Sequence, residues 1–342
     1  MNLKELSTLL GLSQTTVSRA LNGYPEVSEV TRQKVMKAAR KHNYAPNPRA
    51  RGLATGRNHA VGHIIPLSKG HEMVNPVFAD FIAGASEIYS RENIDMLLTV
   101  VPDSGEADAY RKIAAKGSVD GVIVHGPKAD DPRIKLLRDI GMPFVVHGRS
   151  GSADENDYAW VDMNNLRAFE RATHFLIDLG HRRIGLLNGL EAMDFAAKRR
   201  EGYRAALEAA GIAEDPALCH SAEMTEEFGY VATMKVLSLP EPPTALLASS
   251  IIIGYGVRRA LDTLDLRIGK DVSLIVHDDE LSYMRNGSSE PIYTATRSSV
   301  KLAGRICAEM LLDQIAHPER PPRHELLDAD LLIGHTTGPA PK

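Results

Sequence analysis

Seven polar side chains crowd one ten-residue stretch near the amino terminus, SQTTVSRALN at 13–22. They are Ser13, Gln14, Thr15, Thr16, Ser18, Arg19 and Asn22. Amide, hydroxyl and guanidinium groups match the donors, acceptors and thymine methyls that B-DNA displays in its major groove. An arginine also suits a phosphate, as do the hydroxyls. The stretch therefore predicts a surface that contacts a DNA duplex.

A second basic stretch follows at 47–57, NPRARGLATGR. Asn47 can cap a short helix, Pro48 fits its first position, and Gly56 can end it. Leu53 is its one large apolar side chain, and Arg49 is among the arginines around it. An apolar wedge beside arginines suits insertion into the minor groove. A flexible linker is the alternative, and composition alone favours it.

Short helices around a tight turn would position the first polar stretch. Asn2 and Glu5 can form a capping box, Gly11 lets the chain turn, and Ser13 and Ser28 can cap two further helices. The expected inward side chains are Leu3, Leu6, Leu9, Leu10, Val17, Ala20, Leu21, Val35, Met36 and Ala39. This arrangement is a helix-turn-helix with a support helix. The alternative is a plain three-helix bundle with a polar face.

Charge divides the chain unevenly. Residues 1–60 hold ten Lys or Arg against three acids, a net charge of +7. Because the net charge of the whole chain is −4, the remaining residues carry −11. A basic head on an acidic body predicts a polyanionic partner for the head. A basic tail that only aids solubility is the alternative.

From about residue 60 short apolar strands alternate with amphipathic helices. Strands are expected at 60–67, 95–101, 120–126, 143–148, 183–189, 217–222, 244–250 and 272–278, with helices near 76–92, 107–117 and 132–140. Repeated βα units predict two Rossmann-like lobes with parallel sheets, which bind ligands at the carboxyl ends of their strands. A strand and a helix at 292–315 then cross back, and 323–338 reads as a hairpin-like tail.

Enzyme chemistry finds little support. The sequence lacks GxSxG, HExxH and GxxxxGK[ST] motifs, and GYGVRR at 254–259 lacks the third glycine of a dinucleotide site. HDDE at 277–280 has metal-binding residue types, but neighbouring side chains on a strand point to opposite faces. We therefore expect no catalytic residues, no metal and no cofactor.

Composition also bears on the compartment. No apolar run approaches the roughly 20 residues that span a bilayer, and MNLKELSTLL does not resemble a signal peptide. Cys219 and Cys307 form no metal or redox motif, which fits a reducing compartment. A cytoplasmic, nucleoid-associated protein without a membrane partner is expected.

The segments 12–23, 27–47 and 48–56 together resemble the DNA-binding head and hinge of the lactose-repressor (LacI/GalR) family. The resemblance implies that Gln14 and Thr15 read bases together with Arg19. It also implies that the hinge helix pairs with its dimer mate in the minor groove, where it wedges Leu53.

The segments NPVFADFIAG, LGHRRIGLLNG, RREGYRAAL, PTALLASS and VSLIVHDD resemble the periplasmic-binding-protein-type core of the same family. The fold class is therefore an all-α helix-turn-helix head plus an α/β core of two Rossmann-like lobes. The expected parts are the head at 1–46, the hinge at 47–58 and the core at 59–342. Within the core, the near lobe is expected at 60–158 with about 290–318, and the far lobe at 159–289 with about 319–342.

Effector contacts also follow from the resemblance. Arg199 takes the place of the family's effector arginine, and Asp278 that of the first acid in its G[FY]D[DN] motif, with Asp279 left at the lobe surface. His147 and Arg149 are implied as a sugar-contacting pair, and Asp162 lies at the cleft edge. For all of these, a salt bridge without ligand contact is the alternative.

One departure from the family pattern makes the effector harder to identify. Ser250-Ile251 stands where family members usually carry Asn-Asp, so Ser250 replaces the usual ligand-reading amide. Phe78 and Tyr158 are the candidate platforms for stacking a sugar. The whole pattern looks most like regulators of α-glucoside uptake and use.

We therefore expect a homodimeric repressor that binds pseudo-palindromic operator DNA and responds to a small sugar such as an α-glucoside. Its dimer seam is expected on the near lobe and the helix near 298–316. A sugar-binding protein without DNA function is the first alternative, against which the basic helix-turn-helix argues. A sugar-modifying enzyme is the second, against which the missing catalytic motifs argue.

Overall fold

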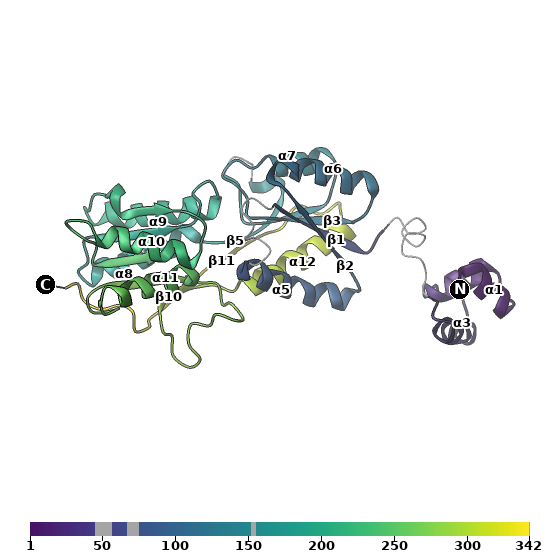
Figure 1. Ribbon diagram of the computed structural model, residues 1–342. Coiled ribbons are helices and arrows are strands. Elements are labelled where there is room, and N and C mark those ends of the chain that lie inside the picture. Colours follow the sequence, from purple (N-terminus) through teal and green to yellow (C-terminus); the bar gives the residue numbers. More distant parts are fainter. Residues whose placement is uncertain (45–56, 67–74, 152–154, 342) are drawn as a thin grey trace. The chain divides into compact units, whose positions relative to one another are not determined.

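The computed structural model describes residues 1–44, 57–66, 75–151 and 155–341 (Figure 1). The chain divides into two compact units, Met1–His59 and Ala60–Lys342. Each unit has its own hydrophobic core.

The described part of the first unit is a helical bundle. Its helices are α1 (Leu3–Leu10), α2 (Gln14–Leu21) and α3 (Glu29–Lys41). Asn2 and Glu5 form the capping box of α1, and Gly11 ends that helix with a left-handed φ of 64°. Ser13 and Ser28 cap α2 and α3 with their side chains. The local signals of the sequence therefore produce these helices.

This head buries a narrower stripe than expected. Its buried core consists of Leu6, Val17, Ala20, Val27, Val35 and Ala39. Leu9 and Met36 were expected to point inward, but they are 55% and 37% exposed. A small bundle covers one line of i, i+4 positions, such as Val35 and Ala39, and Leu9 and Met36 lie beside such lines. The inward assignment of these two residues was wrong.

The near lobe is built on a fully parallel sheet with the strand order β11-β5-β4-β3-β1-β2. Its strands are β1 (Ala60–Pro66), β2 (Asp95–Val101), β3 (Gly121–His125), β4 (Phe144–His147), β5 (Ala159–Met163) and β11 (His324–Leu327). Helices α5 (Pro76–Glu92) and α12 (Val300–Ala316) cover one face, and α6 (Glu106–Lys116) and α7 (Pro132–Asp139) cover the other (Figure 1). A Cβ added to Gly84 would lie 1.9 Å from the Lys301 carbonyl oxygen, so α5 and α12 pack backbone against backbone.

The far lobe has the strand order β12-β10-β9-β8-β6-β7, in which only β12 pairs antiparallel among the described strands. Its strands are β6 (Ile184–Asn188), β7 (Cys219–Ser221), β8 (Ala245–Ala248), β9 (Ser273–Asp278), β10 (Thr294–Arg297) and β12 (Asp330–Leu332). Helices α8 (Asn165–Asp178) and α9 (Asp194–Ala209) cover one face, and α10 (Glu226–Leu237) and α11 (Ile251–Thr263) cover the other. Short 3-10 turns occur at Asp103–Gly105, Glu155–Asp157 and Pro216–Leu218.

The chain passes between the lobes after β5, after β10 and after β11, and not near 158, 289 and 318 as expected. Strand β5 pairs with β4 and β11 in the near sheet, whereas β10 pairs with β9 in the far sheet. The expected lobe boundaries were therefore wrong. The hairpin-like tail was also wrong, since β11 lies parallel to β5 and β12 lies antiparallel to β10.

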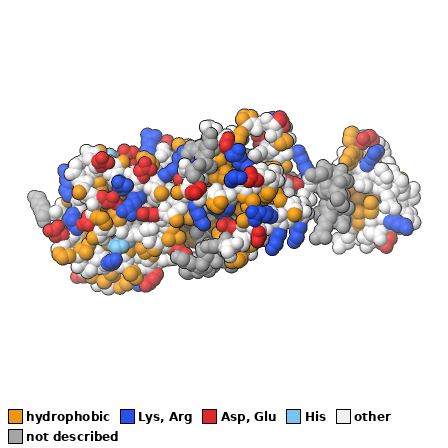
Figure 2. Space-filling model, turned by 90° about the horizontal axis from the view of Figure 1, so that it is seen from above, with side chains coloured by type: hydrophobic (Ala, Val, Ile, Leu, Met, Phe, Trp, Pro, Cys, Tyr) orange, Lys and Arg blue, Asp and Glu red, His pale blue; other side chains and the backbone are white. Residues whose placement is uncertain are grey.

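The surface of the described residues has mixed character. Acidic and basic side chains are interspersed over the face of the molecule drawn in Figure 2. Cys307 is buried and Cys219 half-buried, and both are free thiols. Within the described ranges, no helix is long and apolar enough to cross a membrane.

Candidate functional site

The exposed surface of α2 presents Gln14, Thr15 and Arg19. Ser13 and Thr16 are engaged locally, because Ser13 Oγ accepts from the Thr16 amide at 3.0 Å and the two hydroxyls lie 2.8 Å apart. Of these five predicted DNA contacts, Gln14, Thr15 and Arg19 are exposed, whereas Ser13 caps α2 and bonds to Thr16.

Side chains also hold the segment that leaves α2. Asn22 Nδ2 donates to the Ser18 carbonyl oxygen at 2.9 Å, so these two half-buried residues bond to each other. Arg32 Nη2 donates to the carbonyl oxygens of Tyr24 at 3.0 Å and Gly23 at 3.3 Å. The sequence did not indicate this role of Arg32, because a bond to a turn eight residues away leaves no local pattern.

The predicted hinge contacts Asn47, Arg49 and Leu53 lie outside the described residues. They stay predictions.

Arg199, on α9, is held rigidly in the far lobe. Its Nε donates to Asn165 Oδ1 at 2.7 Å and its Nη1 to the Ser249 carbonyl oxygen at 2.5 Å. The guanidinium lies 5.1 Å from the ring centroid of Phe169 and 5.0 Å from that of Phe195. Burial lowers the pKa of Arg199 to about 10, against the opposing effect of nearby carboxylates. The group therefore remains charged at neutral pH in a fixed orientation.

Asp279, and not Asp278, is the acid whose charge acts on Arg199. Burial alone would raise the pKa of Asp279, but His277 and Arg199 hold it below its usual value. Its Oδ1 lies 3.3 Å from His277 Nε2, and its side chain is only 15% exposed. Asp278 Oδ1 instead accepts from the Glu280 amide at 2.9 Å. The expectation that Asp279 stays at the lobe surface was wrong, because strand alternation turns it toward the same side as His277.

Arg149 and Asp162 form a near-lobe ion pair that a far-lobe lysine joins. Arg149 Nε lies 2.8 Å from Asp162 Oδ2, and Lys198 Nζ, on α9, lies 3.6 Å from the same oxygen. Lys198 also pairs with Asp194 at 2.7 Å, one helical turn earlier. Lys198 and Asp194 were missed from the sequence, although their i, i+4 spacing beside Arg199 was a usable signal.

His147 lies among aromatic rings at the end of β4. Its ring centroid is 4.5 Å from that of Phe81 and 6.3 Å from that of His125, which in turn lies 5.1 Å from Phe78. Burial lowers the pKa of His147 to about 4. The imidazole is therefore neutral at neutral pH, with one nitrogen to donate and one to accept.

Ser250 and Tyr158 are used inside the fold. Ser250 is buried and caps α11, since its Oγ accepts from the Ile252 amide at 3.1 Å. Tyr158 is 2% exposed, and its hydroxyl accepts from the Ser150 amide at 3.0 Å. Tyr158 therefore does not serve as a stacking platform.

Main-chain bonds also join the lobes directly. The Asp194 amide donates to the Pro127 carbonyl oxygen at 3.0 Å, and the Ala129 amide to that of Ala192 at 3.3 Å. These bonds fix the start of α9, which carries Lys198, against the loop that follows β3.

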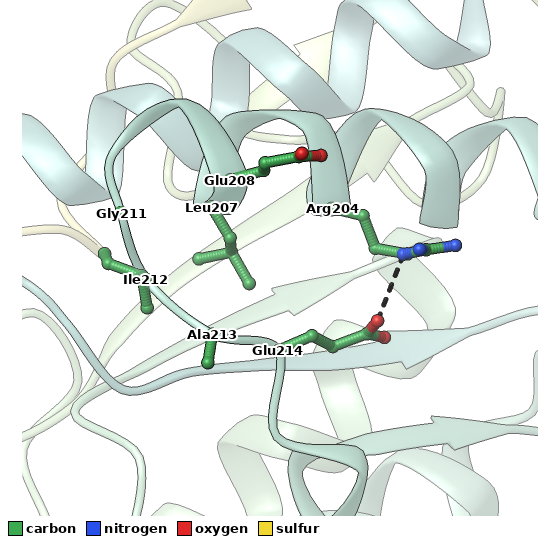
Figure 3. A pocket seen from close by; sticks show the side chains of 7 residues that line it. All are labelled: Arg204, Leu207, Glu208, Gly211, Ile212, Ala213 and Glu214. Atoms are coloured by element: carbon green, nitrogen blue, oxygen red, sulfur yellow. Dashed lines mark ion pairs between the residues drawn. The ribbon is translucent and has the colours of Figure 1, made fainter.

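Figure 3 shows a pocket elsewhere, at the carboxyl end of α9. It is lined by Arg204, Leu207, Glu208, Gly211, Ile212, Ala213 and Glu214. Arg204 Nε and Glu214 Oε2 pair across it at 3.2 Å. A helix that follows a parallel strand runs back along the sheet, so its carboxyl end lies near the amino ends of the strands. This pocket is therefore not at the carboxyl ends of the strands, where a ligand is expected.

Known proteins share both units of the chain. Residues 2–47 match the bacterial regulatory proteins of the lacI family, and residues 173–337 match the periplasmic binding protein-like domain. The chain is 42% identical over 341 residues to the HTH-type transcriptional regulator AglR of Rhizobium meliloti (strain 1021), covering 100% of this chain and 95% of AglR.

Solved structures agree with this match. The complex of the transcriptional regulator CelR with cellobiose has a TM-score of 0.72 at 28% identity, over 98% of this chain and 99% of CelR. The lac repressor dimer bound to operator and the anti-inducer ONPF has the same fold, with a TM-score of 0.85 at 23% identity over 99% of both chains.

A helix-turn-helix head joined to a two-lobed periplasmic-binding-protein-like core defines a class of DNA-binding transcriptional regulators. The chain belongs to the LacI family of bacterial regulatory proteins. The predicted fold class is confirmed, and so is the prediction of a regulator and not an enzyme, since the matched relatives are transcriptional regulators.

Proposed function

We propose that this regulator represses sugar-utilisation genes in the cytoplasm, and that a sugar bound between its lobes, an α-glucoside, controls its hold on DNA. The observation that carries the proposal is the buried, fully oriented guanidinium of Arg199, on which the charge of Asp279 acts. Charged groups of this kind make strong hydrogen bonds to vicinal hydroxyls. The CelR–cellobiose complex supports the proposal, because a relative with this core binds a disaccharide.

The proposed effector contacts come from both lobes. Arg199 and Asp279 would hold the sugar from the far lobe, and His147, Arg149 and Asp162 from the near lobe. Phe78, which is half-buried against His125, is the proposed apolar contact for the sugar ring. Asp278 and Ser250 are assigned to the fold, since both already bond to main-chain amides.

On the DNA side, we propose that two copies read a pseudo-palindromic operator, with Gln14, Thr15 and Arg19 in the major groove. The hinge around Leu53 is proposed to enter the minor groove. Edge strand β2 supports a near-lobe dimer seam, because it exposes a row of large apolar side chains. They are Met96 at 41%, Leu97 at 37%, Leu98 at 36% and Val100 at 40%. An apolar edge strand invites a covering partner.

A thermal-shift screen with neutral mono- and disaccharides, followed by operator titration with and without each hit, tests the proposal. A true effector raises the apparent stability by mass action and changes operator affinity. A sugar that stabilises the protein but leaves operator affinity unchanged would refute the regulatory part. Monomeric behaviour in sedimentation at micromolar concentration, with and without operator, would refute the dimer.

A further inference from the structure

Six charged side chains where the two lobes meet balance one another. The cations are Arg149, Lys198 and Arg199, and the carboxylates are Asp162, Asp194 and Asp279. Arg149 and Lys198 each pair directly with a carboxylate, at 2.8 and 2.7 Å. Arg199 lies in the field of Asp162 and Asp279. Three positive charges therefore face three negative charges.

These groups are also largely withdrawn from solvent. The side chains of Asp162 and Asp194 are 4% and 6% exposed, and those of Arg149 and Lys198 are 16% and 19% exposed. Charges interact strongly when water is excluded, so an added charge without a partner is poorly tolerated there. An incoming anion would meet cations whose carboxylates already neutralise them, and it would be repelled by those carboxylates.

Asp162 is the residue that sets this balance. Its Oδ2 lies within ion-pair distance of both Arg149 in the near lobe and Lys198 in the far lobe. An asparagine at this position would keep the shape and remove the negative charge that these two cations share. The cluster would then carry one uncompensated positive charge.

We infer that the effector is an uncharged sugar, and that the balanced cluster around Asp162 excludes sugar phosphates and uronates. The inference rests on the proposed sugar function and narrows it to one ligand class. Hydroxyl groups suit the cluster because they donate to carboxylates and accept from cations without adding charge.

Calorimetric titration of the full-length protein with matched ligand pairs tests the inference. Suitable pairs are methyl α-glucoside with methyl α-glucuronide, and trehalose, maltose and sucrose each with its phosphate monoester. The neutral member of a binding pair is expected to bind at least ~100-fold more tightly than its anionic partner. In Asp162→Asn that ratio is expected to shrink at least ~10-fold. The matched control is Asp157→Asn, which removes a carboxylate that is 44% exposed and pairs with Arg138 at 2.7 Å on the surface.

The possible outcomes test the inference and the proposed function separately. An anionic sugar that binds the unaltered protein as tightly as its neutral partner overturns the inference, and if it also alters operator affinity the proposed function still holds. If the ratio of neutral to anionic sugar affinity is unchanged in Asp162→Asn, Asp162 does not determine the selectivity. If operator binds but no sugar of either kind does, the proposed function fails and the inference falls with it. The ratio in the unaltered protein decides the inference even if Asp162→Asn loses all binding.

Discussion

Asp80, on α5 of the near lobe, accepts two hydrogen bonds from Ser282 of the far lobe, one from its main-chain nitrogen at 2.7 Å and one from its hydroxyl at 2.5 Å. Asp80 is 6% exposed. Ser282 lies in the segment directly after Asp279, so a near-lobe carboxylate holds the far-lobe segment that carries an effector candidate. The angle between the lobes and the position of Asp279 are therefore coupled.

The coupling predicts that Asp80→Ala weakens sugar binding by about 1–3 kcal/mol, because two bonds to a charged acceptor are lost. Ser282→Ala removes the hydroxyl bond alone and is expected to have a smaller effect. Calorimetry with the best sugar from the screen measures the sugar affinity of both variants. Operator titration without sugar is the control that the head still binds DNA. Equal sugar affinities for Asp80→Ala and the parent would show that the contact does not position Asp279.

The two neighbouring acids are expected to differ. Asp279→Asn should keep operator affinity and lose the sugar response, since it removes a charge that acts on Arg199. Asp278→Asn should keep the response, because its partner is the Glu280 amide. Operator titrations of both variants with and without sugar distinguish them. A response lost in Asp278→Asn and kept in Asp279→Asn would place the sugar as the family resemblance first implied.

In the head, Arg19→Ala is expected to weaken binding to the natural operator by ~1–3 kcal/mol relative to random DNA. Arg32→Ala should instead weaken specific and non-specific binding together, because Arg32 holds the turn after α2. Fluorescence anisotropy at fixed salt with both DNAs measures the difference. An equal loss on both DNAs for Arg19→Ala would make Arg19 a phosphate contact.

Stability should also depend on pH through buried histidines. Burial lowers the pKa of His63 and of His147 to about 4, from a usual value of 6.5. Between these values the unfolded chain binds more protons than the folded one, so the free energy of unfolding falls as the pH falls from about 6.5 toward 4. Each histidine contributes up to about 3 kcal/mol across this window, and that stabilisation is fully present above it. Urea unfolding at pH 7 and pH 5 measures the change. A slope that is not reduced in His147→Gln would contradict the assignment.

Local sequence signals predicted the bounds of those helices whose ends they define. Helix α5 was expected at 76–92 and is found at Pro76–Glu92, since Asn75 caps it and Asn93 ends it in a left-handed conformation. Strands β5, β10 and β11 were assigned to the wrong lobes, because strands of four or five residues take their place from their partners and not from their own pattern.

The candidate site was likewise predicted only in part from the sequence. The family resemblance singled out Arg199, and alternation predicted that Asp278 and Asp279 point to opposite faces. Which of those faces meets Arg199 depends on the helices that cover the sheet, so the pattern could not show that the charge of Asp279, and not that of Asp278, acts on Arg199. Lys198 pairs with Asp162 across the lobe boundary, and such a contact has no signature within either segment.

The order of strands in the two sheets has a consequence for synthesis. The near sheet takes β11 and the far sheet takes β12, so each lobe receives an edge strand from residues 324–332. Neither sheet is complete until this segment has left the ribosome, although most of each lobe is made long before. A chain cut short before residue 324 would lack an edge strand in both lobes at once, so the inner strands β5 and β10 would become edges open to association with other chains.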